Sequence, residues 1–184
     1  MRNDTATALL RDQHRLILKV VAAFECAMRP DDALPPAHDV EAFITFFRLF
    51  TDACHHGKEE DLLFAAMEEH GMGGEGGPID ALRDEHRTGR ALVRAMNEAA
   101  PKLSTAEAGA AFRRNAAAYV DFIRGHIARE DDGLFEVADT RIDGPACAAL
   151  CDAYETVCRR RFEGVTMAHL ERMAEELIES YPAG

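Results

Sequence analysis

Hydrophobic and polar positions alternate at helical spacing through most of the chain, with apolar residues three and four positions apart. The predicted helices span about 4–28, 39–70, 78–99 and 104–137, with shorter helical segments over about 145–162 and 166–181. Connections of roughly ten residues or fewer between the four long helices imply antiparallel neighbours. The pattern therefore predicts an all-α, up-down-up-down four-helix bundle over residues 1–140 and a C-terminal helical extension over 141–184 that packs on it.

Residues with strong positional preferences mark the expected helix ends. Asp39 is the expected N-cap of the second helix, and Pro78 stands at a first helical position in the third. Ser104 opens a capping box before the fourth helix. A loop is expected around Pro30–Asp32, and Gly144-Pro145 breaks the pattern after the fourth helix.

The apolar stripe on each helix identifies the face that should be buried. On the third helix the stripe ends at Asn97, and on the fourth it runs through Tyr119 and His126 to Val137. Tyr119 is expected in the core, with its hydroxyl toward the bundle interior. His14 lies on the stripe of the first helix, so histidines occupy positions that apolar residues would normally fill.

Composition excludes several classes of function. The 184 residues include 21 basic and 33 acidic side chains, for a net charge of -12, and 47% of them are hydrophobic, enough for one domain with a substantial core. With no basic cluster longer than Arg159–Arg161, we expect no nucleic-acid partner. No apolar run approaches a bilayer span and the chain begins with polar residues, so we expect a cytoplasmic protein without membrane contact.

The five cysteines are expected to be reduced, because an odd number cannot all pair within one chain. Cys147, Cys151 and Cys158 recur on one face of a predicted helix, which favours a packing stripe over a redox or metal cluster. Cys54 directly precedes His55 and is expected to pack as well.

Three histidines are followed four residues later by a carboxylate, which places both side chains on one helix face a turn apart. The pairs are His55–Glu59, His56–Glu60 and His126–Glu130. Eight histidines and 33 acidic residues among 184 predict one or two such pairs by chance, so their number alone is weak support. A repeat is stronger: segments 55–64 and 126–135 share the pattern His-x-x-(Lys/Arg)-Glu-(Glu/Asp)-Asp-x-Leu-Phe in phase.

Helix geometry places candidate ligands from all four long helices at one level. At 1.5 Å per residue, the following lie roughly 10 to 20 Å from the end where the first and third helices start: His14, His55, Glu59, His86, His126 and Glu130. Imidazole and carboxylate together suit iron better than calcium or magnesium, and the lack of a cysteine among the candidates disfavours structural zinc. Carboxylates on opposing helices can bridge two metal ions.

This spacing, with the string His-His-Gly-Lys-Glu-Glu-Asp-Leu-Leu-Phe at 55–64, resembles the haemerythrin-like (HHE cation-binding) domains from Leu10 to about Val137. The resemblance implies a four-helix bundle with a non-haem centre of two iron ions, carboxylate- or oxo-bridged. It assigns His14 and His55 to one iron, His86 and His126 to the other, and Glu59 and Glu130 to the bridges.

The third helix departs from the invertebrate oxygen carriers, because Arg90 stands one turn after His86 where they have another histidine. Arginine has no lone pair to donate, so this departure argues against reversible oxygen carriage. His56 is the candidate that completes the shell of the second iron, and otherwise it lies outside the ligand set. Glu60 is the alternative carboxylate at this turn, but the repeat favours Glu59.

The residues and the resemblance together predict a di-iron protein that binds, senses or detoxifies a small ligand, namely oxygen, nitric oxide or peroxide. The alternative is a bundle for iron storage, delivery or iron sensing that acts through a protein partner. A purely structural helical module with incidental histidines is the third reading. The sequence assigns no enzyme class, and it leaves a homodimer open.

Overall fold

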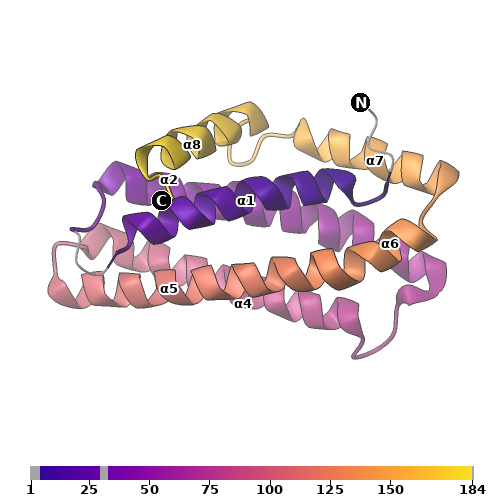
Figure 1. Cartoon of the computed structure of the whole chain (residues 1–184), viewed down its shortest axis with the longest axis horizontal. Helices are drawn as coiled ribbons and strands as arrows, with labels where there is room; N and C mark the ends of the chain where they lie inside the picture. The colour runs from indigo at the N-terminus through magenta and orange to yellow at the C-terminus, as the bar shows by residue number, and fades with distance from the viewer. Residues whose placement is uncertain (1–4, 30–32, 184) are drawn as a thin grey trace.

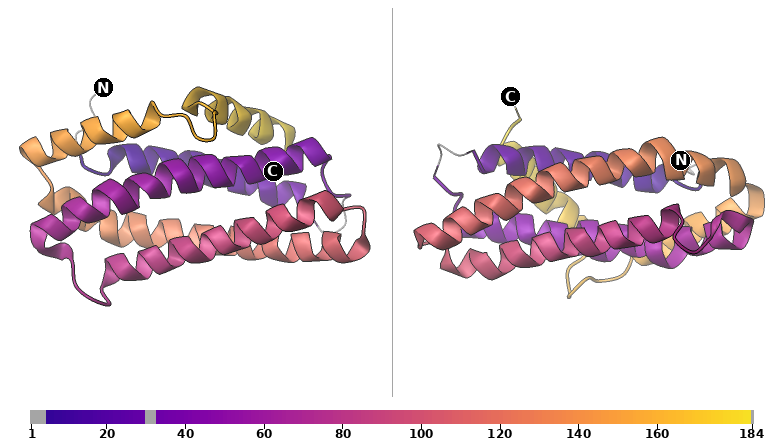
Figure 2. Two further views of the ribbon diagram at one scale, coloured as in Figure 1. Left: turned by 180° about the vertical axis from the view of Figure 1, so that it is seen from behind. Right: turned by 90° about the horizontal axis from the view of Figure 1, so that it is seen from below.

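The computed structural model describes residues 5–29 and 33–183, and these residues form helices without a strand. Four long helical segments lie side by side (Figures 1 and 2). The first is α1 (Ala8–Ala27). The second runs through α2 (Ala37–Phe46), η1 (Phe47–His56), η2 (Glu59–Leu63), α3 (Phe64–Met67) and η3 (Glu68–Met72). The third is α4 (Pro78–Ala99) with a short 3-10 turn, η4 (Ala100–Lys102), and the fourth comprises α5 (Ala106–Arg129), η5 (Glu130–Leu134) and α6 (Phe135–Arg141).

Two further helices, α7 (Gly144–Cys158) and α8 (Met167–Ser180), follow one another along an outer side of these segments (Figure 1). Helix α8 packs on α1, α2 and η1, whereas α7 packs on η2. Leu170, Ala174 and Leu177 of α8 are buried in the same apolar cluster as Phe24 and Phe43. The prediction of an all-helical chain is therefore confirmed.

Two helices begin at other residues than predicted. The second segment begins at Ala37, so Asp39 lies in its first turn and is not the N-cap. The fourth segment is capped by Thr105, whose hydroxyl accepts a hydrogen bond from the Ala108 N–H at 3.2 Å. The expected cap, Ser104, is one residue too early for its side chain to replace this bond.

Two of the other expected boundaries are confirmed. Pro78 is the first residue of α4, as predicted. The predicted break at Gly144 is also present, because α6 ends at Arg141 and α7 begins at Gly144, whose φ of 50° is one that glycine tolerates best. The predicted loop at Pro30–Asp32 and the earliest expected helix start, Asp4, lie outside the described residues.

Four stretches of the described residues are π-helical, and two of them, η2 and η5, begin at Glu59 and Glu130, the glutamates of the two repeated segments. A π turn holds about one residue more than an α turn, so it shifts the buried face that follows it. Phe135 and Ala138 are fully buried, whereas Val137, predicted in the core, is 47% exposed. The prediction for Val137 was wrong because it assumed an unbroken α-helical period.

The apolar core has two clusters, and a layer of buried histidines and glutamates, here called the polar layer, separates them. One cluster surrounds Phe24, Phe47 and Phe112, and the other surrounds Phe64 and Phe135. On α4 the first cluster takes Met96 and leaves the predicted Asn97 exposed. Within the part of the chain that the structure describes, we find no helix with the length and apolar character needed to cross a membrane.

Candidate metal centre

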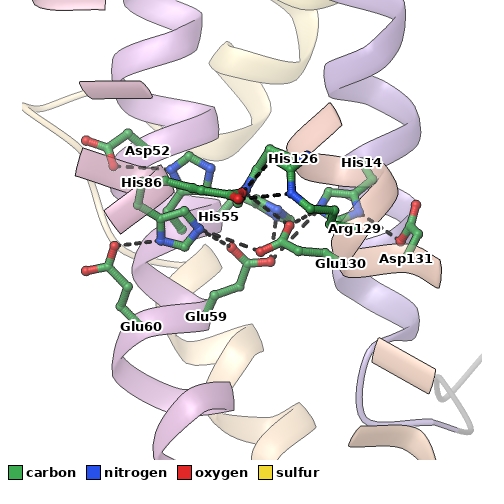
Figure 3. A network of polar contacts seen from close by, with 12 residues as sticks. His14, Asp52, His55, Glu59, Glu60, His86, His126, Arg129, Glu130 and Asp131 are labelled. Carbon is green, nitrogen blue, oxygen red and sulfur yellow. Dashed lines mark hydrogen bonds and ion pairs between the residues drawn. The ribbon is translucent and has the colours of Figure 1, made fainter. Parts of the chain in front are cut away.

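The polar layer between the clusters brings together every residue that the sequence singled out for metal binding. Each is at most 3% exposed: His14, His55, His56, Glu59, His86, His126 and Glu130. They form two overlapping groups in which the donor atoms lie within 4.8 Å of one another, one of His14, His55, Glu59 and Glu130, and one of His56, Glu59, His86 and His126. Figure 3 shows six of them converging from four helical segments: His14, His55, Glu59, His86, His126 and Glu130.

The repeated segments supply the carboxylates of the layer. Within each segment the histidine and glutamate meet one turn apart, with His55 Nε2 3.3 Å from Glu59 Oε1 and His126 Nε2 3.3 Å from Glu130 Oε2. Both glutamates also reach across the bundle, because His14 Nε2 lies 3.3 Å from Glu130 Oε2 and 3.9 Å from Glu59 Oε1. Each carboxylate is thus placed between histidines of different helices.

The phenylalanines that end the repeated segments close the layer on one side. Phe135 stacks on His14, with ring centroids 5.1 Å apart, and Phe64 stacks on His86 at 5.8 Å. Each ring covers the histidine of another helix and not the one in its own segment. The phenylalanine that ends each repeated segment is fully buried and places an apolar ring against the polar layer.

The inner atoms of the layer lack hydrogen bonds. Within the described residues, the Nε2 atoms of all five histidines and all four oxygens of Glu59 and Glu130 are buried without a hydrogen-bond partner. A single buried unsatisfied polar group costs about 1–3 kcal/mol, so nine at one point call for a bound species. Two ligand atoms that each lie about 2.1 Å from one metal ion, and that subtend a right angle at it, are about 3 Å apart. The shorter distances between histidine Nε2 atoms and carboxylate oxygens in the layer, 3.3 Å, are close to this value. These residues therefore fit a cation, and their mix of imidazole and carboxylate suits iron.

The outer nitrogen of every histidine in the layer has its own partner. The Nδ1 atoms pair with carboxylate or amide oxygens: His14 with Asp131 at 3.0 Å, His55 with Gln13 at 3.1 Å, His56 with Asp52 at 3.4 Å, His86 with Glu60 at 2.7 Å and His126 with Glu85 at 2.8 Å. A proton held on Nδ1 by such a partner leaves the Nε2 lone pair directed inward. The five rings are therefore prepared as donors toward the centre of the layer.

These outer partners were not found from the sequence, although four of them leave a simple signal there. They are direct neighbours of residues in the layer, and each serves a histidine on another segment: Gln13 beside His14, Glu60 beside Glu59, Glu85 beside His86 and Asp131 beside Glu130. Asp52 differs, because it lies one turn before His56 on the same helix.

Arg90 links two of the outer partners. Its Nε donates to Asp52 Oδ1 and its guanidinium also donates to Glu60 Oε1, both at 2.7 Å. Glu60 therefore lies outside both donor groups, between Arg90 and His86. A histidine at this position of α4 could offer a further nitrogen ligand. Arg90 instead binds the two carboxylates that orient His56 and His86.

Burial and neighbouring charge shift the pKa values of four histidines of the layer in two directions. Burial lowers the pKa of His14 and His86, but hydrogen bonds to carboxylates outweigh it and raise both pKa values to about 9. Burial, reinforced by neighbouring histidines, lowers the pKa of His55 and His56 well below the usual value. Burial also raises the pKa of Glu59. The layer therefore holds protons that a bound cation would displace.

A cavity of about 200 Å³ reaches the layer from the side of His56, and Asp52, Gly89 and Arg90 contribute to its wall. Tyr119 also lines this cavity and is 1% exposed, with its ring 4.6 Å from that of Phe47. Tyr119 thus packs in the core, as the sequence predicted. The cavity offers a small molecule a path toward the layer.

Comparison with known proteins identifies the family to which the chain belongs. The family model of the Hemerythrin HHE cation binding domain matches residues 5–138, a range that contains all seven donors and both repeated segments. Comparisons with curated proteins and with solved structures find no match. Because the matched range covers well over half of the chain, this protein belongs to the Hemerythrin HHE cation binding domain family, whose members bind metal cations, usually iron.

Proposed function

We propose that the polar layer holds two iron ions and that the protein uses them to bind, sense or detoxify oxygen, nitric oxide or peroxide. The observation that supports this proposal is the set of nine inward donor atoms that are buried without hydrogen bonds. A layer built only for packing would lose free energy at each of these atoms.

The two donor groups suggest how the ligands divide. One ion takes His14 and His55, and the other takes His56, His86 and His126. Glu59 belongs to both groups, and Glu130 lies within 3.6 Å of His86 as well as 3.3 Å of His14, so both glutamates are placed to bridge. His56 then supplies the donor that Arg90 cannot.

The proposal extends to the architecture. Residues 1–140 form the up-down-up-down bundle of the family, and residues 141–184 form an extension that covers α1 and the second segment. The contacts of α4 with α5 and of α1 with α5 and α8 support this assignment. Two of the four π-helical stretches begin at Glu59 and Glu130, and π turns are frequent at functional sites.

Iron in this layer supplies redox chemistry and coordination positions for a small diatomic or peroxide ligand. The chain's own residues prepare the site. The five outer partners hold the histidine tautomers, Phe64 and Phe135 exclude water, and the cavity beside His56 admits a small molecule.

Elemental analysis of protein purified after iron-replete expression, together with its optical spectrum, tests the proposal. We expect about two irons per chain and charge-transfer absorption that changes on adding peroxide or nitric oxide. Protein that contains only zinc, or no metal, would refute the di-iron centre. An iron spectrum that neither ligand alters would instead support storage or delivery of iron.

A further inference from the structure

A second cluster of reactive side chains lies outside the polar layer, where the C-terminal end of α7 lies near η1. Its members are Cys54 of η1, Lys58 in the next turn and Cys158 at the end of α7. The Lys58 Nζ lies 3.0 Å from Cys54 Sγ and 3.5 Å from Cys158 Sγ. The three groups thus join the helix that carries His55 and His56 to the C-terminal extension.

Lys58 is unusual because its side chain is fully buried. Among the described residues, the ammonium nitrogen has two hydrogen-bond partners, and both are cysteine sulfurs. A buried ammonium without a carboxylate partner is costly, and it strongly favours the thiolate form of an adjacent cysteine. Packing alone would not place a lysine here, since an apolar side chain of similar length fills the same volume without that cost.

The two cysteines differ in access to solvent. Cys54 is fully buried, whereas Cys158 is half-buried and contributes to the wall of a separate cavity of about 430 Å³, together with Phe50 and Arg159. The hydrogen bond from Cys54 and the charge of Lys58 lower the pKa of Cys158 to about 6 despite burial. A molecule that enters this cavity therefore meets Cys158 first.

We propose that Cys158 and Cys54 form a redox-active dithiol, activated by Lys58, that a hydroperoxide oxidises to a disulfide. The Cys158 thiolate attacks one peroxide oxygen, so that an S–O bond forms, the O–O bond breaks and the departing alkoxide takes a proton from solvent. The Cys54 thiol then attacks the sulfenic acid, so that the S–S bond forms and water leaves with the thiol proton. The two sulfurs together lose two electrons, and the peroxide gains them.

The consequence is a covalent link between the extension and the bundle. The disulfide would join the end of α7 to the residue before His55, and it would remove the thiolate that faces Lys58. None of the three members of this cluster belongs to either donor group of the polar layer.

Alkylation kinetics on the full-length protein as purified provide the first test, with Cys151 as a matched control because it is also half-buried and lies on α7. We expect iodoacetamide to modify Cys158 about tenfold faster than Cys151 or more at neutral pH, since thiolate fraction outweighs the lower nucleophilicity of an acidic thiol. Lys58→Met should remove this difference, and circular dichroism shows whether that variant folds. Equal rates at the two cysteines in the wild type, or an unchanged rate in a folded Lys58→Met protein, would overturn the activation.

Peptide mapping after treatment with hydrogen peroxide provides the second test. The expected product is a Cys54–Cys158 disulfide, and in Cys54→Ser a sulfenic acid at Cys158 that dimedone traps. Repeating the treatment after chelation removes metal-driven oxidation, so the outcome does not depend on the proposed iron centre. Unmodified thiols at Cys54 and Cys158, or oxidation that occurs only with metal present, would refute the dithiol.

Discussion

Replacing Glu59 or its neighbour Glu60 compares a glutamate that we propose bridges two ions with one that contacts a histidine only at its outer nitrogen. Both Glu59 oxygens are buried, and they lie 3.3 to 3.9 Å from the Nε2 atoms of His14, His55 and His86. Glu60 is partly exposed and contacts the outer nitrogen of His86. We therefore expect Glu59→Gln to abolish binding at both ions, whereas Glu60→Gln weakens affinity by about 10–100-fold.

The magnitude follows from linkage between binding and folding. A metal present at 1,000 times its dissociation constant stabilises the folded state by about 4 kcal/mol per site. For a chain of this size each kcal/mol raises the unfolding temperature by about 2–4 °C, so one such site raises it by about 8–16 °C. Without metal, Glu59→Gln should have the opposite effect on the stability of the folded state. Burial raises the pKa of Glu59, so the charged carboxylate is disfavoured in the folded protein. That variant should unfold at an equal or higher temperature than wild type without metal.

Thermal unfolding with and without ferrous iron under anaerobic conditions, combined with elemental analysis, measures both effects. Glu60→Gln serves as the control, because it removes a carboxylate from the same turn. The reasoning fails if Glu59→Gln retains the full iron-dependent shift, or if Glu60→Gln loses as much of the shift as Glu59→Gln does.

Four further substitutions test other parts of the structure. His56→Ala should reduce iron from about two ions per chain to about one by elemental analysis, and an unchanged content would remove His56 from the ligand set. Arg90→Met frees the carboxylates that hold His56 and His86, so iron affinity measured by competition with a chelator should fall about tenfold, and wild-type affinity would mean that this link is unimportant. Gly133→Ala should raise the free energy of unfolding by about 0.5–1 kcal/mol in denaturant titration, because a Cβ there meets nothing within 4 Å. Gly89→Ala should lack this gain, because its Cβ would lie 2.9 Å from the Phe122 ring, and equal gains would contradict the packing described.

The residues of the polar layer were largely predictable from the sequence, because helical geometry is local. A histidine and a glutamate four residues apart share a helix face wherever the helix is placed, and the rise per residue sets their height. The sequence therefore determined that His14, His86 and the two repeated pairs lie at one level. It also determined the all-helical class and the first residue of α4.

Contacts between side chains on different helices could be identified only from the tertiary structure. The partners of the outer nitrogens depend on the rotation of each helix about its axis and on side-chain rotamers, which spacing along one helix does not specify. Arg90 could be recognised as a missing ligand, but its contacts with Asp52 and Glu60 join two different segments. The same is true of Lys58, whose two sulfur partners come from η1 and α7.

The repeat around Glu59 and Glu130 could be found in the sequence, but the π turns that begin at these residues could not. The repeat showed that residues 55–64 and 126–135 are equivalent, yet it could not show that an extra residue enters the turn after each glutamate. That choice depends on packing around the polar layer, because it allows a buried carboxylate to face the centre while Phe64 and Phe135 stack on histidines of other helices. The sequence by itself determined which residues form the layer, whereas the packing of the helices decided how each one is oriented and held there.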